Sequence, residues 1–186
     1  MNKKRKLWEL NRPSQEAYSL QDKIPIIVLL DDVRSFENVG SVFRTADSFS
    51  IQEVLLCGIT PVPPHREIHK TALGATDSVA WRHFPSIIDA VLGLKLQGYA
   101  VFAIEQAKKT TPLHRIHEFT LVKVALVFGN EVHGVQQAVV DLCDAVIEIP
   151  QFGTKHSLNI SVCAGVSLWE FSKIMNPGLQ GKKGEA

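Results

Sequence analysis

Residues 24–49 read IPIIVLLDDVRSFENVGSVFRTADSF and contain a predicted strand, a polar loop and a predicted helix, in that order. The run 24–30 is continuously apolar and rich in β-branched residues, which is typical of a strand buried on both faces. Over 39–49 the apolar residues recur every three or four positions, which predicts a helix with one buried face, and Asn38 is its expected N-cap.

The rest of the chain repeats this alternation. Further strands are expected at 51–57, 78–84, 99–104, 122–128 and 145–149, and helices at 66–73, 85–97, 135–143 and 158–175. Residues 58–65 form a proline-rich loop, and 105–120 are expected to be mostly loop. Strands that alternate with helices predict an α/β fold with a mostly parallel sheet and helices on both faces.

Composition fits one globular domain. The chain has 186 residues, of which 45% are hydrophobic and 21% charged. Its longest apolar run, 24–30, is far shorter than the roughly 20 residues of a membrane helix, and no apolar segment follows the basic start as it would in a secretory signal. The three cysteines are far apart and no metal-ligand spacing is present, so we expect a cytoplasmic protein without metal.

The net charge of +1 conceals an uneven distribution. Residues 1–12 carry a charge of +4, whereas 13–177 carry −4. We therefore expect a basic arm with a short helix at 1–23, a single domain at 24–175 and a flexible tail at 176–186. The arm could bind a polyanion or could simply be a solvated terminus, and both interpretations stay open.

The last predicted helix, 158–175, is apolar around nearly its whole circumference. A helix of this kind must be buried on all sides. Either a partner subunit covers part of it or it lies at the centre of one subunit.

Three polar loops follow predicted strands, at 31–40, 129–134 and 151–159. Ligands of α/β sheets bind at the carboxyl ends of the strands, so the loops would form one crevice if their strands are neighbours. None has the glycine-rich pattern of a phosphate loop, and Ser157 lacks the nucleophile elbow of a serine hydrolase. Arg44, on the polar side of its helix, could reach the crevice and would suit a phosphate.

The three segments together resemble a known set of motifs. They read NVGSVFRTA at 38–46, VFGNEVHG at 127–134 and IPQFGTKHSLNIS at 149–161. In order and spacing they resemble the three motifs of the SPOUT superfamily, specifically its SpoU/TrmH branch of RNA ribose 2′-O-methyltransferases. The resemblance covers about residues 24–175.

This resemblance implies a SPOUT-type fold with a deep C-terminal trefoil knot, a homodimer and S-adenosylmethionine as cofactor. Arg44 would be the central catalytic residue, either as a base or as an orienting cation. The implied catalytic set is Arg44, Asn38, Glu131, Ser157 and Asn159. The implied cofactor-binding residues are Ile104, Gly129, Ile149, Ser157 and Leu158.

The implied substrate is structured RNA. The short basic arm and the compact chain favour transfer RNA over ribosomal RNA, because many ribosomal-RNA enzymes of the branch carry an added N-terminal domain. One alternative is a non-catalytic RNA-binding or assembly protein on a SPOUT fold. Another is a nucleotide-dependent enzyme on an ordinary doubly wound fold. The RNA, the nucleotide position and the base are not determined by the sequence.

Overall fold

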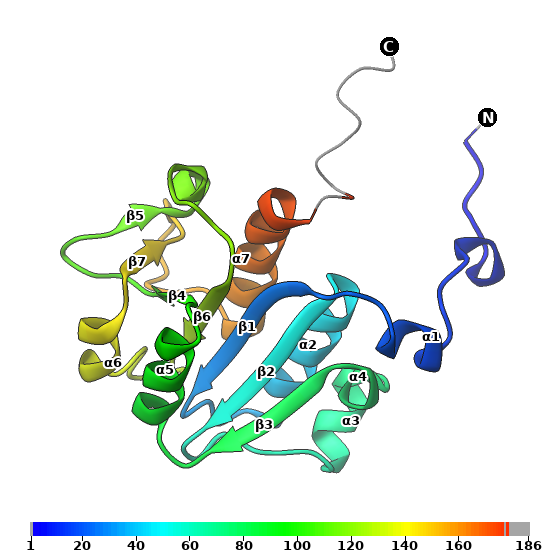
Figure 1. Ribbon diagram of the computed structural model, residues 1–186, viewed down its shortest axis with the longest axis horizontal. Helices are drawn as coiled ribbons and strands as arrows, with labels where there is room; N and C mark the ends of the chain where they lie inside the picture. The colour runs from blue at the N-terminus through cyan, green and yellow to red at the C-terminus, as the bar shows by residue number, and fades with distance from the viewer. Residues whose placement is uncertain (1, 177, 179–186) are drawn as a thin grey trace.

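The computed structural model describes residues 2–176 and 178, and its centre is a seven-stranded sheet (Figure 1). Every pair of neighbouring strands is parallel, in the order β3-β2-β1-β6-β4-β7-β5. The strands are β1 Ile24–Asp31, β2 Ile51–Cys57, β3 Ala80–Phe84, β4 Ala100–Ile104, β5 Thr111–Pro112, β6 Val124–Phe128 and β7 Ala145–Glu148. The predicted α/β class and parallel sheet are confirmed.

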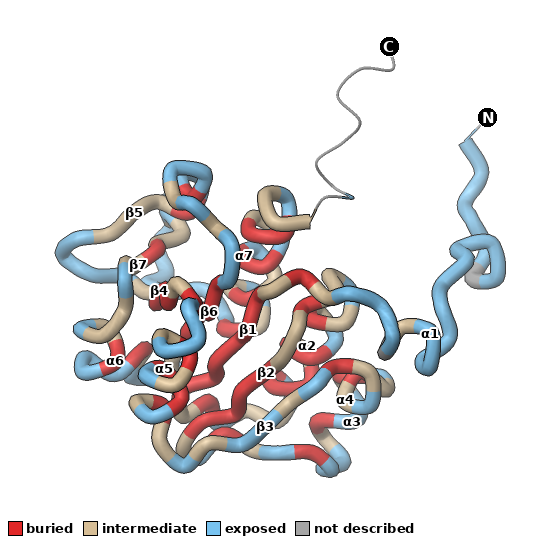
Figure 2. Tube along the Cα trace, in the orientation of Figure 1, coloured by how far each residue is buried: buried red, intermediate tan, exposed pale blue. Residues whose placement is uncertain are grey.

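Helices cover both faces of this sheet. The α-helices are α1 Gln15–Ser19, α2 Phe36–Ser48, α3 Arg66–Ala72, α4 Ala75–Ser78, α5 Ile87–Leu96, α6 Gln137–Leu142 and α7 Ile160–Met175. Two 3₁₀ helices are η1 Leu7–Leu10 and η2 Leu113–Glu118. Buried residues of α2, α3, α7 and η2 pack on one face, and those of α5 and α6 pack on the other. The strands β1, β2, β4 and β6 are accordingly the most buried part of the chain, whereas β3 at the edge is largely exposed (Figure 2).

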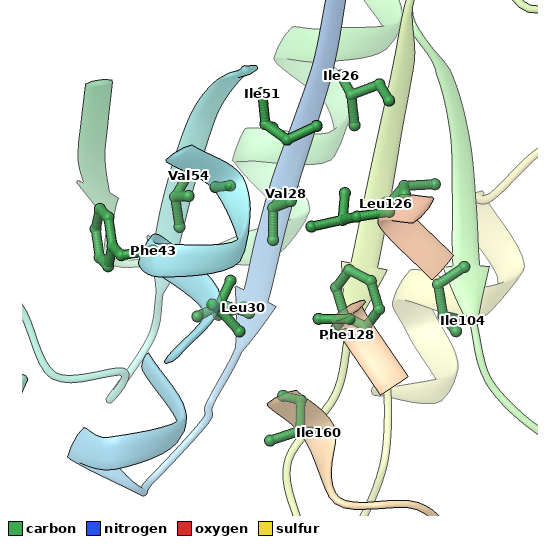
Figure 3. Close-up of a cluster of buried hydrophobic side chains, with 14 of the residues drawn as sticks. Ile26, Val28, Leu30, Phe43, Ile51, Val54, Ile104, Leu126, Phe128 and Ile160 are labelled. Carbon is green, nitrogen blue, oxygen red and sulfur yellow. The ribbon is translucent and has the colours of Figure 1, made fainter. Parts of the chain in front are cut away.

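The central strands β1 and β6 are buried on both faces, which explains their unbroken apolar sequence. Ile26, Val28 and Leu30 of β1 point into one hydrophobic cluster, while Ile27 and Leu29 point into the other. Figure 3 shows the first cluster, to which β6 contributes Leu126 and Phe128, α2 contributes Phe43 and α7 contributes Ile160.

The start of α2 differs from the prediction in a way that affects the site. The helix begins at Phe36, and Ser35 is its N-cap, because the Ser35 Oγ accepts a hydrogen bond from the Asn38 backbone N–H at 3.1 Å. The expectation that Asn38 caps the helix is therefore wrong. Its side chain lies inside the first turn and is available for contacts with other loops.

Three further expectations need correction. The stretch 105–120 was expected to be mostly loop but contains β5 and η2. No helix was predicted at Ala75–Ser78, where the structure has α4. The last helix begins at Ile160, after an Asn159 cap, rather than at 158. The remaining elements begin and end within about two residues of their predicted bounds. A difference of this size is usual at the ends of helices and strands.

The prediction that α7 is buried on all sides is wrong for the single chain. Val162, Val166 and Trp169 on this helix have exposed fractions of 51%, 40% and 44%. They follow one another at helical spacing of four and three residues, so they form one stripe along the helix.

The first described residues lie outside the sheet. The segment that carries η1 extends away from the domain, whereas α1 lies beside α4 (Figure 1), and the Tyr18 hydroxyl donates to the Asp47 carbonyl at 2.8 Å. Of the predicted tail, 176–186, only residues 176 and 178 are described, and the rest lies outside the described residues. Among the described residues, no helix has the length and apolar character needed to cross a membrane.

Helices α2 and α3 pack unusually closely at Gly40. A Cβ atom at this position would lie 2.1 Å from the Thr71 Oγ1 and 2.4 Å from the Ile68 carbonyl oxygen. The second of these atoms is backbone and cannot rotate away. The contact therefore requires glycine and fixes the position of α3 against the first half of α2.

Replacing this glycine tests the contact. We expect Gly40→Ala to lower the free energy of unfolding by about 1–3 kcal/mol, the usual cost of overpacking, as measured by urea denaturation. Gly93→Ala in α5 is the matched control, because a Cβ there meets nothing within 4 Å. It should stabilise by about 0.5–1 kcal/mol through helix propensity. Equal effects of the two substitutions would contradict the close packing.

Candidate active site

The predicted crevice lies at the carboxyl edge of the sheet. The loops after β1 and β6 belong to neighbouring strands, but β4 stands between β6 and β7. The condition that all three strands are neighbours is therefore met only for the first two loops. The third loop, 151–159, reaches them because the chain returns toward α2 before α7 begins.

Glu131 joins the second loop to the first. One carboxylate oxygen accepts a hydrogen bond from the Arg34 backbone N–H at 3.0 Å. The other accepts from the Ser35 N–H at 3.0 Å and from the Asn38 Nδ2 at 3.1 Å. Partial burial opposes ionisation, but these bonds and one from its own backbone hold the pKa of Glu131 below its ordinary value. The side chain is thus a carboxylate at neutral pH, with both oxygens engaged.

Asn38 also joins the first loop to the third. Its Oδ1 accepts a hydrogen bond from the Asn159 Nδ2 at 3.2 Å. The Asn159 Oδ1 in turn accepts from the Ser161 backbone N–H at 2.9 Å and caps α7. One chain of hydrogen bonds, from Glu131 through Asn38 to Asn159, therefore connects all three loops.

A cleft of ≈1130 Å³ opens beside this series of hydrogen bonds, between the loops that follow β4, β6 and β7. Its walls include apolar side chains such as Phe128 and Val146, and the carboxylate-bearing Glu105. All five predicted cofactor-binding residues line it: Ile104, Gly129, Ile149, Ser157 and Leu158. Glu131 and Asn159 also line it, whereas Asn38 and Arg44 do not.

Gly129 allows the 129–134 loop to pack closely against the end of β6. A Cβ at this position would lie 2.0 Å from the Gly134 carbonyl carbon and 2.1 Å from the Val135 nitrogen. The close approach of the loop backbone to the end of β6 therefore requires glycine at this position.

Arg44 stands apart from the other predicted catalytic residues. It lies on α2 six residues after Asn38, roughly 240° around the helix axis, and it is exposed. Within the part of the chain that the structure describes, its guanidinium has no hydrogen bond or ion pair. A single chain thus brings together Asn38, Glu131 and Asn159, places Ser157 at the cleft, and leaves Arg44 free toward solvent.

Two residues of the cleft that join neighbouring loops were not predicted as site residues. Glu105, directly after β4, accepts a hydrogen bond from the Val135 N–H at 2.9 Å. Gln106 donates from its Nε2 to the His156 carbonyl at 2.7 Å and ties the β4 loop to the third loop. Both follow a buried strand at the carboxyl edge, and this position was a signal that could have identified them.

A smaller cavity of ≈470 Å³ lies on the other side of the 129–134 loop and is lined by Asp31, Arg34 and His133 among others. Burial raises the pKa of Asp31, against hydrogen bonds from Gln136 that lower it. Among the described residues, no group of three or more His, Cys, Asp or Glu side chains is arranged to hold a metal ion.

Known proteins share this fold and these loops. The SpoU rRNA methylase family matches residues 25–169. A 23S rRNA (guanosine-2′-O-)-methyltransferase, RlmB, from Vibrio parahaemolyticus is 28% identical over 87% of this chain and 64% of its own length. An AdoMet-bound rRNA methyltransferase from Sinorhizobium meliloti has a TM-score of 0.74 and 25% identity, over 88% of this chain and 60% of that one.

A third relative is more compact. A structure described as concerning 2-OH methylation of C/U34 on tRNA has a TM-score of 0.70 and 25% identity, over 80% of this chain and 94% of that one. By contrast, the chain spans less than two thirds of the length of the curated relatives that it matches. Because the family match covers most of the sheet and all three motif loops, the chain belongs to the SpoU rRNA methylase family, as the SpoU/TrmH motifs indicated.

Proposed function

We propose that this protein methylates a ribose 2′-hydroxyl of RNA and that S-adenosylmethionine is the methyl donor. The observation that carries the proposal is the hydrogen-bonded chain Glu131–Asn38–Asn159 beside a cleft lined by every predicted cofactor residue. The RlmB relative, named for guanosine 2′-O-methylation, and the tRNA 2-OH methylation relative support the same reaction.

The cleft fits the proposed cofactor. Its volume of ≈1130 Å³ lies slightly above the roughly 300–1,000 Å³ range of ordinary ligand pockets, so the cleft is large enough for the cofactor. Ile104, Phe128 and Ile149 offer apolar walls for an adenine ring. S-adenosylmethionine would supply an electrophilic methyl group on a sulfonium. The Sinorhizobium relative, whose structure is described as AdoMet-bound, supports this choice.

The site residues then divide into holding and reacting roles. Glu131 is a poor candidate for the base, because its lowered pKa and its engaged oxygens make it a weak proton acceptor. It holds the first loop in place instead. Ser157 lies at the cleft and is exposed, so its hydroxyl can hydrogen-bond the substrate.

Arg44 is the free cation of the set. An arginine stays charged at any physiological pH, so neutralising a phosphate and orienting the neighbouring hydroxyl are easier roles for it than proton abstraction. Its lack of a partner among the described residues leaves the guanidinium available for that contact.

Removing this cation tests the proposed function. We expect Arg44→Ala to lower methyl transfer into RNA by about 100- to 1,000-fold, the usual effect of losing one stabilising donor. Binding of S-adenosylmethionine, measured by calorimetry, should be unchanged because Arg44 does not line the cleft.

Arg115→Ala is the matched control, since Arg115 is an exposed arginine that pairs with Glu118 on η2. It should leave both measurements as in the wild type. Normal turnover of Arg44→Ala, or a collapse of its cofactor affinity, would contradict the assignment.

The proposed substrate is transfer RNA rather than ribosomal RNA. The relative whose structure concerns 2-OH methylation of C/U34 on tRNA supports this choice. Mapping 2′-O-methyl groups in both RNA classes, in cells with and without the protein, decides between them. The cytoplasm is the proposed location.

We also propose the homodimer and the trefoil knot that the family resemblance implies. The knot is supported by α7, which follows the returning third loop and packs against α2, β1 and η2. An experimental chain trace without a threaded C-terminal segment would contradict it. The dimer is supported by the exposed stripe Val162, Val166 and Trp169, because soluble monomers rarely expose a contiguous apolar patch.

A charge in this stripe tests the dimer. We expect twice the monomer mass for the wild type in light scattering at micromolar concentration, and the monomer mass for Val166→Glu. Leu96→Glu is the control, because Leu96 is also an exposed apolar residue but lies on α5, across the sheet. A monomeric wild type would contradict the proposal.

A further inference from the structure

Two aromatic rings lie stacked at the edge of the site. The rings of Phe36 and His65 have centroids 3.9 Å apart and planes inclined by 26°. Phe36 is the first residue of α2 and also packs against the hydrophobic cluster on its face of the sheet. His65 precedes α3 and is exposed, so its imidazole forms the accessible part of the pair.

The pair is continuous with the three-loop site. Phe36 follows Ser35, whose N–H is bound by Glu131, and it precedes Asn38 by two residues. A molecule whose backbone lies at this site can therefore reach the rings with an adjoining group. The rings lie on the side of the site that faces α3, whereas the cofactor cleft lies between the loops of β4, β6 and β7.

The pair is also held rigidly. The His65 Nδ1 accepts a hydrogen bond from the Glu67 backbone N–H at 3.3 Å and caps α3. The Thr71 Oγ1 donates to the Glu37 carbonyl at 3.2 Å and joins the two helices. Together with the close packing at Gly40, these contacts set both rings before any ligand arrives, which lowers the entropic cost of binding.

Two arginines adjoin the ring residues in the sequence, Arg34 two positions before Phe36 and Arg66 directly after His65. Arg34 and Arg66 are exposed, and the side chain of Arg66 has an exposed fraction of 93%. Its ion pair with Glu67, at 3.7 Å, is a surface contact of a kind worth little, so the guanidinium can turn to another anion. Glu37 and Glu67 keep the patch from being strongly basic, which argues against binding driven by charge alone.

We propose that the Phe36–His65 pair is a stacking platform for an unpaired nucleobase of the RNA, next to the ribose that is methylated. A ring face beside a guanidinium matches a base beside its phosphate, and unpaired bases commonly stack on aromatic side chains in this way. A single exposed ring among mixed charges is too small an apolar area for a stable protein interface. This inference rests on the proposed function, since it supplies a contact for the same RNA.

Two substitutions at His65 separate stacking from helix capping. Asparagine is a good N-cap without a ring, whereas tyrosine retains a ring without the Nδ1 acceptor. We expect His65→Asn to weaken binding of bulk transfer RNA and of a short oligoadenylate by about 5- to 150-fold, the value of one stacked base. His65→Tyr should bind within about twofold of the wild type. Affinity for S-adenosylmethionine should be the same in all three.

If His65 only caps the helix, His65→Asn, which keeps a cap, would bind RNA as tightly as the wild type, and this result would overturn the proposal. His69→Asn, a change at another exposed histidine of α3, is the control and should have no effect.

An abasic RNA locates the contact. In the RNA that the wild type methylates, removing one base beside the target should cost the wild type about the same affinity as His65→Asn, and should cost the variant nothing more. Additive losses at every neighbouring position would refute stacking. A wild type that binds oligoadenylate through His65 but methylates no RNA would contradict the proposed function and leave the platform standing.

Discussion

The carboxylate of Glu131 holds the active-site loops in register. It accepts two backbone N–H groups at the start of α2 and the side-chain amide of Asn38. Asn38 is thereby oriented with its Oδ1 toward Asn159, and Asn159 fixes the start of α7. Without the charge on Glu131, two N–H groups would lose their acceptor and the amide of Asn38 would be free to rotate. The loops of three strands would then no longer share one geometry.

This arrangement divides the carboxyl edge of the sheet between the two proposed ligands. The loops after β4, β6 and β7 enclose the cleft that suits the cofactor. The loop after β1, together with α2 and α3, presents Arg44, Arg34 and the Phe36–His65 pair to solvent, on the side proposed for RNA. Glu131 and Asn38 lie at the boundary, and their hydrogen bonds keep the two sides aligned.

Elements that depend on the local sequence were predictable, whereas contacts between distant parts of the chain mostly were not. The strand at 51–57 and the doubly buried strands β1 and β6 were predictable because continuous burial leaves continuous apolar sequence. The start of α2 was not predictable, because Ser35 and Asn38 are both good N-cap residues. Which of them caps the helix depends on Phe36 packing against His65. β5 is a two-residue edge strand containing a proline, and only its pairing with β7 creates it. The three motifs indicated the candidate site residues, but not that Asn38 and Asn159 touch, nor that Arg44 stands apart.

The central claim is that the acceptor is a ribose hydroxyl, and replacing that hydroxyl tests it most directly. A methylated RNA is first identified, and the target nucleotide is then replaced by its 2′-deoxy form while the rest of the RNA is kept. The account predicts that methyl incorporation at that nucleotide disappears, because the attacking oxygen is gone. The variant RNA should still bind, since phosphates and bases are unchanged. Continued methylation at the deoxy nucleotide would show that the base is the acceptor and would contradict the account.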